Sequence, residues 1–398
     1  MKLFKENELK LLWPFYLDYL VSYILYFAPA FWIVFFRDLG FSMFQISVVI
    51  AALPLSMLLF EIPTGAVADL FGRKFSVILG MVLEGLCFLG LFFSTNYYAI
   101  LVLFAFLGFS SSFSSGSKEA WVVDLVKKRD KKLLHEYFVK SGFLTSIALC
   151  LSGIVGAFFV KSFGVSVIWL FAFASLAVTV ITLSFGEEEY KRRNIRIRDS
   201  VREIKKQSAT SINYARKHPV LFYLIVGGFF IALAGAFSES LTWVPFLQSL
   251  DFPDYAFGYL WSAMFAVSAV APFFAKKLKG KSRERGFIIK MTLIGILSLL
   301  FVYFTNSWYL ALFVMLFSIF FLTVQTPISR SYFHRFIPSK LRSTIGSVES
   351  MILSIAAILA LPLVGYLIDT IGARYVIMLS AIVAIPGIIA YILIREKK

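Results

Sequence analysis

The chain has 398 residues, of which 59% are hydrophobic and 18% aromatic, and its mean hydropathy is +0.82. Only 16% of the residues are charged, against about 25% in soluble domains, so too little polar surface exists to cover a soluble body. The composition therefore excludes an ordinary soluble protein and predicts an all-α membrane protein, because the apolar runs are too long for barrel strands. The net charge of +16 would suggest a nucleic-acid partner in a soluble chain. Here the charges lie between apolar runs, which argues against nucleic acid.

Twelve apolar runs, separated by charged or turn-rich breaks, predict twelve transmembrane helices. The first run follows Lys2, Lys5 and Lys10 and has no A-x-A-like site, which predicts an uncleaved first span rather than a signal peptide. In chain order, the predicted spans are 12–36, 44–65, 75–94, 97–117, 139–160, 166–185, 219–243, 255–274, 287–305, 308–328, 344–366 and 375–394.

The basic residues are distributed very unequally between the two ends of these spans. Of the 39 Lys and Arg residues, 35 fall on one side, three on the other, and Lys118 lies within a span. Positive charge collects on the cytoplasmic side, so we expect a multi-pass protein of the cell membrane with both termini in the cytoplasm. The positive charge then serves topology and contact with the lipid bilayer.

One long loop divides the predicted spans into two groups of six. Residues 186–218 are rich in charge, beginning with Glu187-Glu188-Glu189 and Lys191-Arg192-Arg193. We therefore predict a six-helix half at 1–185, a cytoplasmic central loop at 186–218 and a second six-helix half at 219–398.

A short frame recurs at the ends of four spans and indicates an internal repeat. It reads small-x-x-x-charged-x-x-Gly, and its first and second copies, like its third and fourth, are 92 residues apart. Such spacing favours three-span repeats of inverted topology, from which secondary transporters are built. The copies are Gly65/Asp69/Gly72, Ala157/Lys161/Gly164, Phe273/Lys277/Gly280, in which the small residue is lost, and Gly365/Asp369/Gly372.

The first copy is the most complete and continues into two basic residues. The sequence Gly65-Ala-Val-Ala-Asp69-Leu-Phe-Gly72-Arg73-Lys74 resembles the signature loop of the major facilitator superfamily of secondary transporters. The resemblance implies two six-helix halves, each of 3+3 inverted repeats, and transport by alternating access. It also implies a conformational latch formed by Gly65, Asp69, Gly72, Arg73 and Lys74, in which Asp69 contacts the eleventh span and Arg73 pairs with Asp124. The other interpretation is a plain anchor of topology.

Further blocks bear on the branch of the family. The blocks Glu61-Ile-Pro-Thr-Gly65 and Gly116-Ser-Lys-Glu119-Ala-Trp121 resemble a branch rich in efflux proteins. The fourth span lacks the central Arg that drug antiporters often carry, and the fifth lacks their Gly-Pro motif. Both absences weaken the antiporter interpretation without excluding it.

Charged and polar residues inside spans are candidates for function. The resemblance implies that spans 1, 4, 7 and 10 line a central cavity, which assigns to the cavity Asp18, Lys118, Glu119, Glu239 and Gln325. Proton coupling needs a carboxyl group that can be neutralised and recharged there. The alternatives are an ion pair for Asp18, a structural pair with Glu61 or Asp124 for Glu119, and an exposed or gating position for Glu239.

Three further acids, Glu61, Glu84 and Glu349, lie in other spans. For Glu84 we weigh a functional role against a hydrogen bond to a neighbouring helix, and for Glu349 we favour a structural role. Aromatic residues on cavity helices, with Tyr26 and Trp243, would suit hydrophobic or cationic compounds.

Other mechanisms lack their residues. The chain has no G-x-x-x-x-G-K-[ST] motif, no nucleophile elbow and no zinc motif, and Cys87 and Cys150 lie inside apolar runs. We therefore expect no enzyme, metal or cofactor, and a proton gradient as the driving force. The first hypothesis is proton-coupled efflux of amphiphilic, drug-like compounds by a monomer. The alternatives are a proton-coupled uptake symporter for a sugar or organic anion, and a non-transporting receptor or scaffold.

Overall fold

The computed structural model describes residues 6–129, 133–188, 213–214, 216–280, 283–338 and 341–394. All regular structure in these residues is helical, and twelve helices or helix runs are long and apolar enough to cross a membrane. The predicted fold class and the twelve spans are therefore confirmed. The spans run Glu8–Asp38, Met43–Phe71, Arg73–Phe93, Tyr97–Arg129, Leu133–Phe163, Val167–Ser184, Pro219–Gln248, Asp254–Lys279, Glu284–Phe304, Trp308–Arg335, Thr344–Ile371 and Ala373–Leu393.

Spans 2, 3, 5, 6, 8, 9, 11 and 12 have no break in their helix. Their α-helices are α4 (Met43–Phe71), α5 (Arg73–Phe93), α8 (Leu133–Phe163), α9 (Val167–Ser184), α13 (Phe257–Lys279), α14 (Glu284–Ser298), α17 (Arg342–Ile371) and α18 (Ala373–Leu393). The 3₁₀ helix η2 (Asp254–Ala256) precedes α13, and η3 (Leu299–Phe304) continues α14. Several helices extend past the predicted limits, because a charged residue ends an apolar run without ending a helix.

Spans 1, 4, 7 and 10 are interrupted within their length. Span 1 contains α1 (Glu6–Leu17), the π-helix η1 (Asp18–Ser22), α2 (Tyr23–Leu25) and α3 (Ala28–Asp38). The other three contain α6 (Tyr97–Ser114) and α7 (Ser117–Arg129), α11 (Pro219–Ala236) and α12 (Ser240–Gln248), and α15 (Trp308–Val324) and α16 (Thr326–Arg335). These are the four spans that the resemblance assigns to a central cavity.

Each interruption has a local cause. Gly116 takes a φ of +69° between α6 and α7, a conformation that a residue with a Cβ rarely adopts. Glu239 has extended backbone angles between α11 and α12. Pro327, at the start of α16, has no N–H to donate to the carbonyl of Thr323. Span 1 leaves helical geometry at Tyr26 and restarts next to Pro29.

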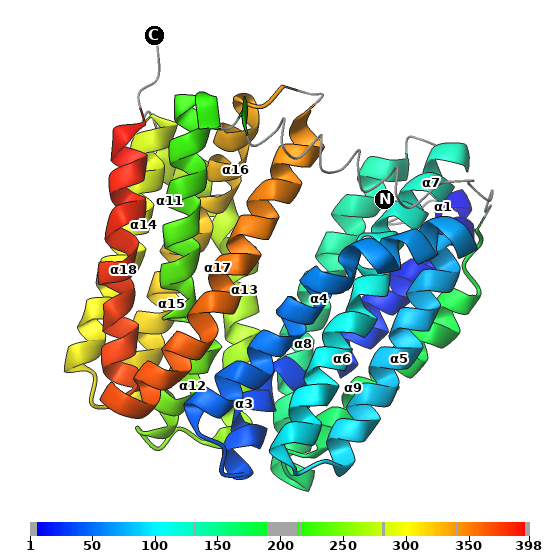
Figure 1. Cartoon of the computed structure of the whole chain (residues 1–398), viewed down its shortest axis with the longest axis horizontal. Helices are drawn as coiled ribbons and strands as arrows, with labels where there is room; N and C mark the ends of the chain where they lie inside the picture. Colours follow the sequence, from blue (N-terminus) through cyan, green and yellow to red (C-terminus); the bar gives the residue numbers. More distant parts are fainter. Residues whose placement is uncertain are drawn as a thin grey trace. The chain divides into compact units, whose positions relative to one another are not determined.

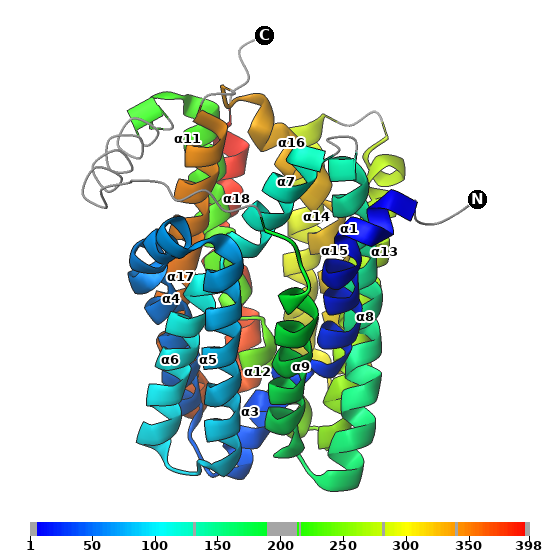
Figure 2. The same cartoon turned by 90° about the vertical axis from the view of Figure 1, so that its right-hand side faces the viewer.

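The chain divides into two compact units. The first comprises residues 1–41, 52–199 and 254–262, and the second comprises residues 42–51, 200–253 and 263–398. In the first unit α5 lies beside α6 and α9, and in the second α11 lies beside α18 (Figures 1 and 2). Because residues 42–51 belong to the second unit and residues 52–199 to the first, the helix α4 begins in one unit and continues in the other. The predicted central loop, 186–218, falls largely outside the described residues.

The repeat frame ends helices in all four of its copies. Its glycines have φ values between +50° and +100°, at the end of α4, after α8, after α13 and at the end of α17: Gly72, Gly164, Gly280 and Gly372. A side chain would be strained at such a φ, which explains why glycine stands in every copy.

Candidate functional site

The candidate site lies in the first unit, where Asp18 begins the π-helix η1. The Asp18 side chain is 1% exposed, although it carries a charge in the middle of an apolar run. A π-helix widens one turn of a helix and is frequent at functional sites. Asp18 is therefore presented from a local distortion of span 1 rather than from regular helix.

The partner of Asp18 is Lys118 on α7. Lys118 stands two residues after Gly116, so the turn between α6 and α7 brings it to span 1, where Nζ forms an ion pair with Asp18 Oδ2. The same Nζ lies 4.5 Å from the centre of the Tyr19 ring and 6.0 Å from that of Tyr23. The pair thus combines a charge-assisted hydrogen bond with a cation–π contact.

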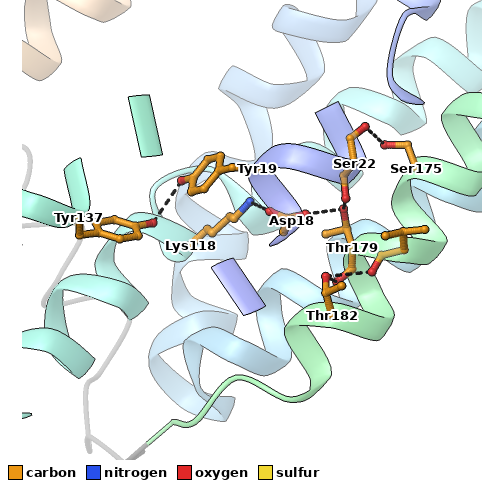
Figure 3. Close-up of polar contacts among 9 residues, drawn as sticks. Asp18, Tyr19, Ser22, Lys118, Tyr137, Ser175, Thr179 and Thr182 are labelled. Atoms are coloured by element: carbon orange, nitrogen blue, oxygen red, sulfur yellow. Dashed lines mark hydrogen bonds and ion pairs between the residues drawn. The ribbon is translucent and has the colours of Figure 1, made fainter. Parts of the chain in front are cut away.

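Hydroxyl groups hold the second oxygen of Asp18. Thr179 on α9 donates from Oγ1 to Asp18 Oδ1 at 2.6 Å, and the Ser22 hydroxyl lies 2.7 Å from the same Thr179 oxygen. Ser175 donates to the carbonyl oxygen of Ser22 at 2.8 Å. Figure 3 shows this chain of polar groups running from Lys118 through Asp18 to α9. Both carboxylate oxygens therefore have partners.

The sequence predicted two members of this group and missed the others. Asp18 and Lys118 were predicted as cavity residues, and the ion pair is the alternative considered for Asp18. Ser22, Ser175 and Thr179 were not predicted, because single hydroxyls are common in membrane helices and usually bond to their own backbone. The available signal was the four-residue spacing of Ser175 and Thr179, which places both on one face of α9.

The other predicted cavity residues lie elsewhere. Glu119 has an exposed side chain and forms no ion pair with a described residue, so neither Glu61 nor Asp124 is its partner. Glu239 is exposed at the break between α11 and α12, and Gln325 lies at the break between α15 and α16 with Oε1 buried and without a hydrogen-bond partner. Glu239 and Gln325 belong to the second unit.

The three further acids have different surroundings. Glu61 is exposed on α4. Glu349 Oε2 lies 2.8 Å from Arg330 Nη1, an ion pair between α17 and α16 that agrees with a structural role. Glu84 on α5 is partly buried and forms no ion pair with a described residue, and its hydrogen bond to a neighbouring helix stays a prediction.

The signature loop follows α4 and begins α5. Arg73 Nη1 lies 2.7 Å from Asp124 Oδ2, so the pairing implied by the family resemblance is present. The side chains of Asp69 and Asp124 are exposed, and Gly65 has open space where a Cβ would be. An exposed ion pair contributes little to stability, about 0–1 kcal/mol. This pair therefore matters for linking α5 to α7 at this place rather than for the free energy of unfolding.

The same loop also holds the residues that follow α9. Glu188 Oε1 accepts hydrogen bonds from the backbone N–H groups of Arg73 at 2.7 Å and Lys74 at 3.2 Å, at the start of α5. Lys74 Nζ donates to the carbonyl oxygens of Ser184 at 2.7 Å and Gly186 at 2.9 Å. The N-terminus of α5 thus faces a carboxylate and the C-terminus of α9 faces an ammonium group, which are the charges that the helix dipoles favour. The sequence assigned Glu188 to a charged loop and gave no sign of this contact.

We expect Glu188→Ala to lower the thermal stability of the purified protein. Among the described residues it removes the side-chain acceptor of two N–H groups at the start of α5, and losing such a cap costs about 0.5–2 kcal/mol. Glu187→Ala is the matched control, because the Glu187 side chain forms an exposed ion pair with Arg129 at 3.3 Å. Melting curves in detergent measure both variants, and equal shifts would contradict a capping role.

A similar contact occurs at the fourth copy of the repeat frame. Asp369 accepts hydrogen bonds from the backbone N–H groups of Met43 at 2.9 Å and Phe44 at 2.8 Å, at the start of α4. Gly365, one turn earlier, permits close packing here, because a Cβ on it would lie 2.5 Å from the Met43 carbonyl oxygen. The Asp of the frame therefore caps the helix N-terminus of another repeat.

Comparison with known proteins places the chain in a family. The sequence model described as Major Facilitator Superfamily matches residues 16–289 and 255–398. An uncharacterized MFS-type transporter of Bacillus subtilis (strain 168), YxaM, is 23% identical over 387 residues, covering 94% of this chain and 92% of that protein.

Two solved transporters share the fold at low sequence identity. The nucleoside transporter NupG superposes with a TM-score of 0.71 at 13% identity, covering 95% of this chain and 98% of NupG. A bacterial homolog of the human lysosomal transporter Spinster, in an inward-facing and occupied conformation, gives 0.72 at 14% identity, covering 96% and 95%. With the family match spanning nearly its whole length, the chain belongs to the major facilitator superfamily and is a secondary transporter rather than an enzyme.

Proposed function

We propose that this transporter exports hydrophobic or amphiphilic, drug-like compounds in exchange for protons. The observation that carries the proposal is the buried pair of Asp18 and Lys118, held where spans 1 and 4 are both interrupted. Discontinuous helices are typical of substrate sites in secondary transporters, and charged groups inside membrane spans are functional candidates by default.

The surroundings of the pair favour an amphiphilic cation. Asp18 and Lys118 neutralise each other, and the rings of Tyr19 and Tyr23 lie near the ammonium group. A cationic compound that enters the site can take the place of Lys118 at the Asp18 carboxylate and on the Tyr19 ring. Its apolar part then contacts the aromatic side chains of the same spans.

The signature loop supports alternating access. Asp369 caps the start of α4, and the repeat predicts that Asp69 caps the start of the eleventh span in the opposite state. In this proposal Gly65, Asp69, Gly72, Arg73, Lys74 and Asp124 form the latch of that state. We also propose that the protein is a monomer in the cell membrane, with both termini in the cytoplasm.

Uptake of a polar metabolite is a second candidate, favoured by the hydroxyl groups around Asp18. Ser22, Ser175 and Thr179 could exchange their mutual hydrogen bonds for bonds to a sugar or a similar compound. NupG, which has the same fold, is a nucleoside transporter.

Proteoliposomes that contain a pH-sensitive dye distinguish these functions. We expect cationic amphiphiles to move protons through the wild-type protein, and we expect Asp18→Asn to abolish that movement. Glu119→Gln is the matched control in the same region, because the Glu119 side chain is exposed and has no ion pair with a described residue. Movement with only sugars, nucleosides or organic acids would overturn the export proposal, and substrate flux without proton movement would overturn the coupling.

A further inference from the structure

Glu84 lies in the middle of span 3, far from both ends of its helix. It is the twelfth residue of α5 (Arg73–Phe93), about 16 Å along the helix from its start at 1.5 Å per residue. Its side chain is partly buried, and it stands one turn after Gly80, where a Cβ would lie 2.8 Å from the Ser110 carbonyl oxygen of α6, and one turn before Phe88, whose ring lies 5.9 Å from that of Tyr26 in span 1. Residues four apart share one face of a helix, so Glu84 lies on the face of α5 that packs against spans 1 and 4.

Glu84 differs from the other buried acids of the first unit because it has no cation. Glu8 binds Lys140 at 2.6 Å and Asp18 binds Lys118, whereas no Lys, Arg or His among the described residues forms an ion pair with Glu84. A carboxylate in the membrane interior is unfavourable unless it is paired. The site therefore favours the neutral acid.

The charged and titratable groups around Glu84 do not supply the missing partner. The helix α9, which packs against α5, contains no titratable residue, and α6 contributes only Tyr97 and Tyr98 at its far end. On α7, Lys118 is bound to Asp18, and Asp124 is bound to Arg73 of α5. On this side of α5 stand Cys87 of the same helix and Tyr26, whose ring packs against Phe88, and neither side chain carries a positive charge.

A row of tyrosines leads from Glu84 along span 1. Tyr16, Tyr19, Tyr23 and Tyr26 follow one another at spacings of three, four and three residues, which places them on one face of α1, η1 and α2. The Tyr19 and Tyr23 rings are 5.7 Å apart, and Tyr137 donates to the Tyr19 hydroxyl at 3.3 Å. At the far end of the row, Tyr16 donates to Glu8 at 2.8 Å.

We propose that Glu84 is the carboxyl group that carries the transported proton, which leaves toward the cytoplasmic end of span 1 along this row of tyrosines. The inference rests on the proposed proton-coupled function and assigns its two tasks to two acids. Asp18 keeps its ion pair with Lys118 until it meets the substrate, while Glu84 gains and loses the proton. Protonating Asp18 instead would break its ion pair, whereas protonating Glu84 breaks none.

Infrared difference spectroscopy of the purified full-length protein tests the assignment without any substrate. We expect the wild type to show the carbonyl stretch of a neutral carboxylic acid, shifted in heavy water and lost as the pH rises. Glu84→Gln should remove this band, because glutamine resembles the neutral acid but cannot titrate. Asp18→Asn should leave it in place. A band that survives in Glu84→Gln, or no such band in the wild type, would overturn the proposal.

Transport measurements separate this assignment from the proposed function. With a compound that moves protons through the wild type, we expect Glu84→Gln to lose accumulation driven by a pH gradient. The same variant should keep exchange of labelled for unlabelled compound, since substrate contact is assigned to Asp18. Glu84→Asp should restore part of the coupling. Coupled transport by Glu84→Gln would overturn the role of Glu84 alone, whereas a wild type that moves no protons would overturn both proposals.

Discussion

Replacing Lys118 with methionine should destabilise the protein severely. The Asp18 carboxylate, 1% exposed, would lose the cation that pairs with it, and breaking a buried ion pair from one side costs about 3–5 kcal/mol. Asp18→Asn should cost less, because Lys118 is 14% exposed and its long side chain can turn its ammonium group toward water. Melting temperatures in detergent, with the fraction of monodisperse protein, measure the difference.

The double variant Asp18→Asn/Lys118→Met is the control for this prediction. It leaves no unpaired charge, so it should be markedly more stable than Lys118→Met alone. If the single and double variants melt at the same temperature, Asp18 and Lys118 are not coupled and the pair described above does not organise the site. Recovery of stability without recovery of transport would show that the pair is needed for function as well as for folding.

The second large effect is expected at Gly108 on α6. A Cβ at this position would collide with the carbonyl oxygen of Leu53 and would lie 2.9 Å from the Leu53 carbonyl carbon on α4. Both are backbone atoms, so no side chain can move aside, and α6 must separate from α4. We expect Gly108→Ala to cost about 1–3 kcal/mol, as overpacking does in a tight core, and Gly108→Leu to prevent folding.

Gly142→Ala provides the matched control for Gly108→Ala. Gly142 also lies inside a long helix, α8, but a Cβ there would meet no atom within 4 Å. Alanine favours helix over glycine by about 1 kcal/mol, so this variant should melt at the same or a slightly higher temperature. Equal destabilisation by both substitutions would mean that helix contact at Gly108 is not what limits stability.

The fold could be predicted from the sequence because each membrane span is a continuous run of residues whose hydropathy identifies it. Lipid requires about 20 apolar residues for each span, and the breaks between them carry charge. The four glycines of the repeat frame were informative for the same reason. Each takes a φ of +50° or more, which favours glycine whatever the residue packs against. The interruptions of spans 1, 4, 7 and 10 were not predicted, because polar residues there are few and hydropathy hardly changes.

The candidate site was predicted only in its charged members. Asp18 and Lys118 are conspicuous because charges are rare in such runs, but their pairing depends on the turn at Gly116 and on the π-helix. Thr179 reaches Asp18 from 161 residues away, and no local pattern records such a contact. Glu188 was hidden for a related reason, since an acid in a charged loop looks the same whether or not it caps a helix.

The helix α4 lacks one internal hydrogen bond close to the point where it passes from the second unit to the first. Its first turns pack within the second unit and the remainder within the first, with the division at residues 51 and 52. Pro54 lies just beyond, and since proline has no N–H, the carbonyl of Ile50 lacks its usual helical partner at that point. A helix bends most easily where one of its internal hydrogen bonds is missing, and here that point lies about ten residues from the N-terminus that Asp369 caps.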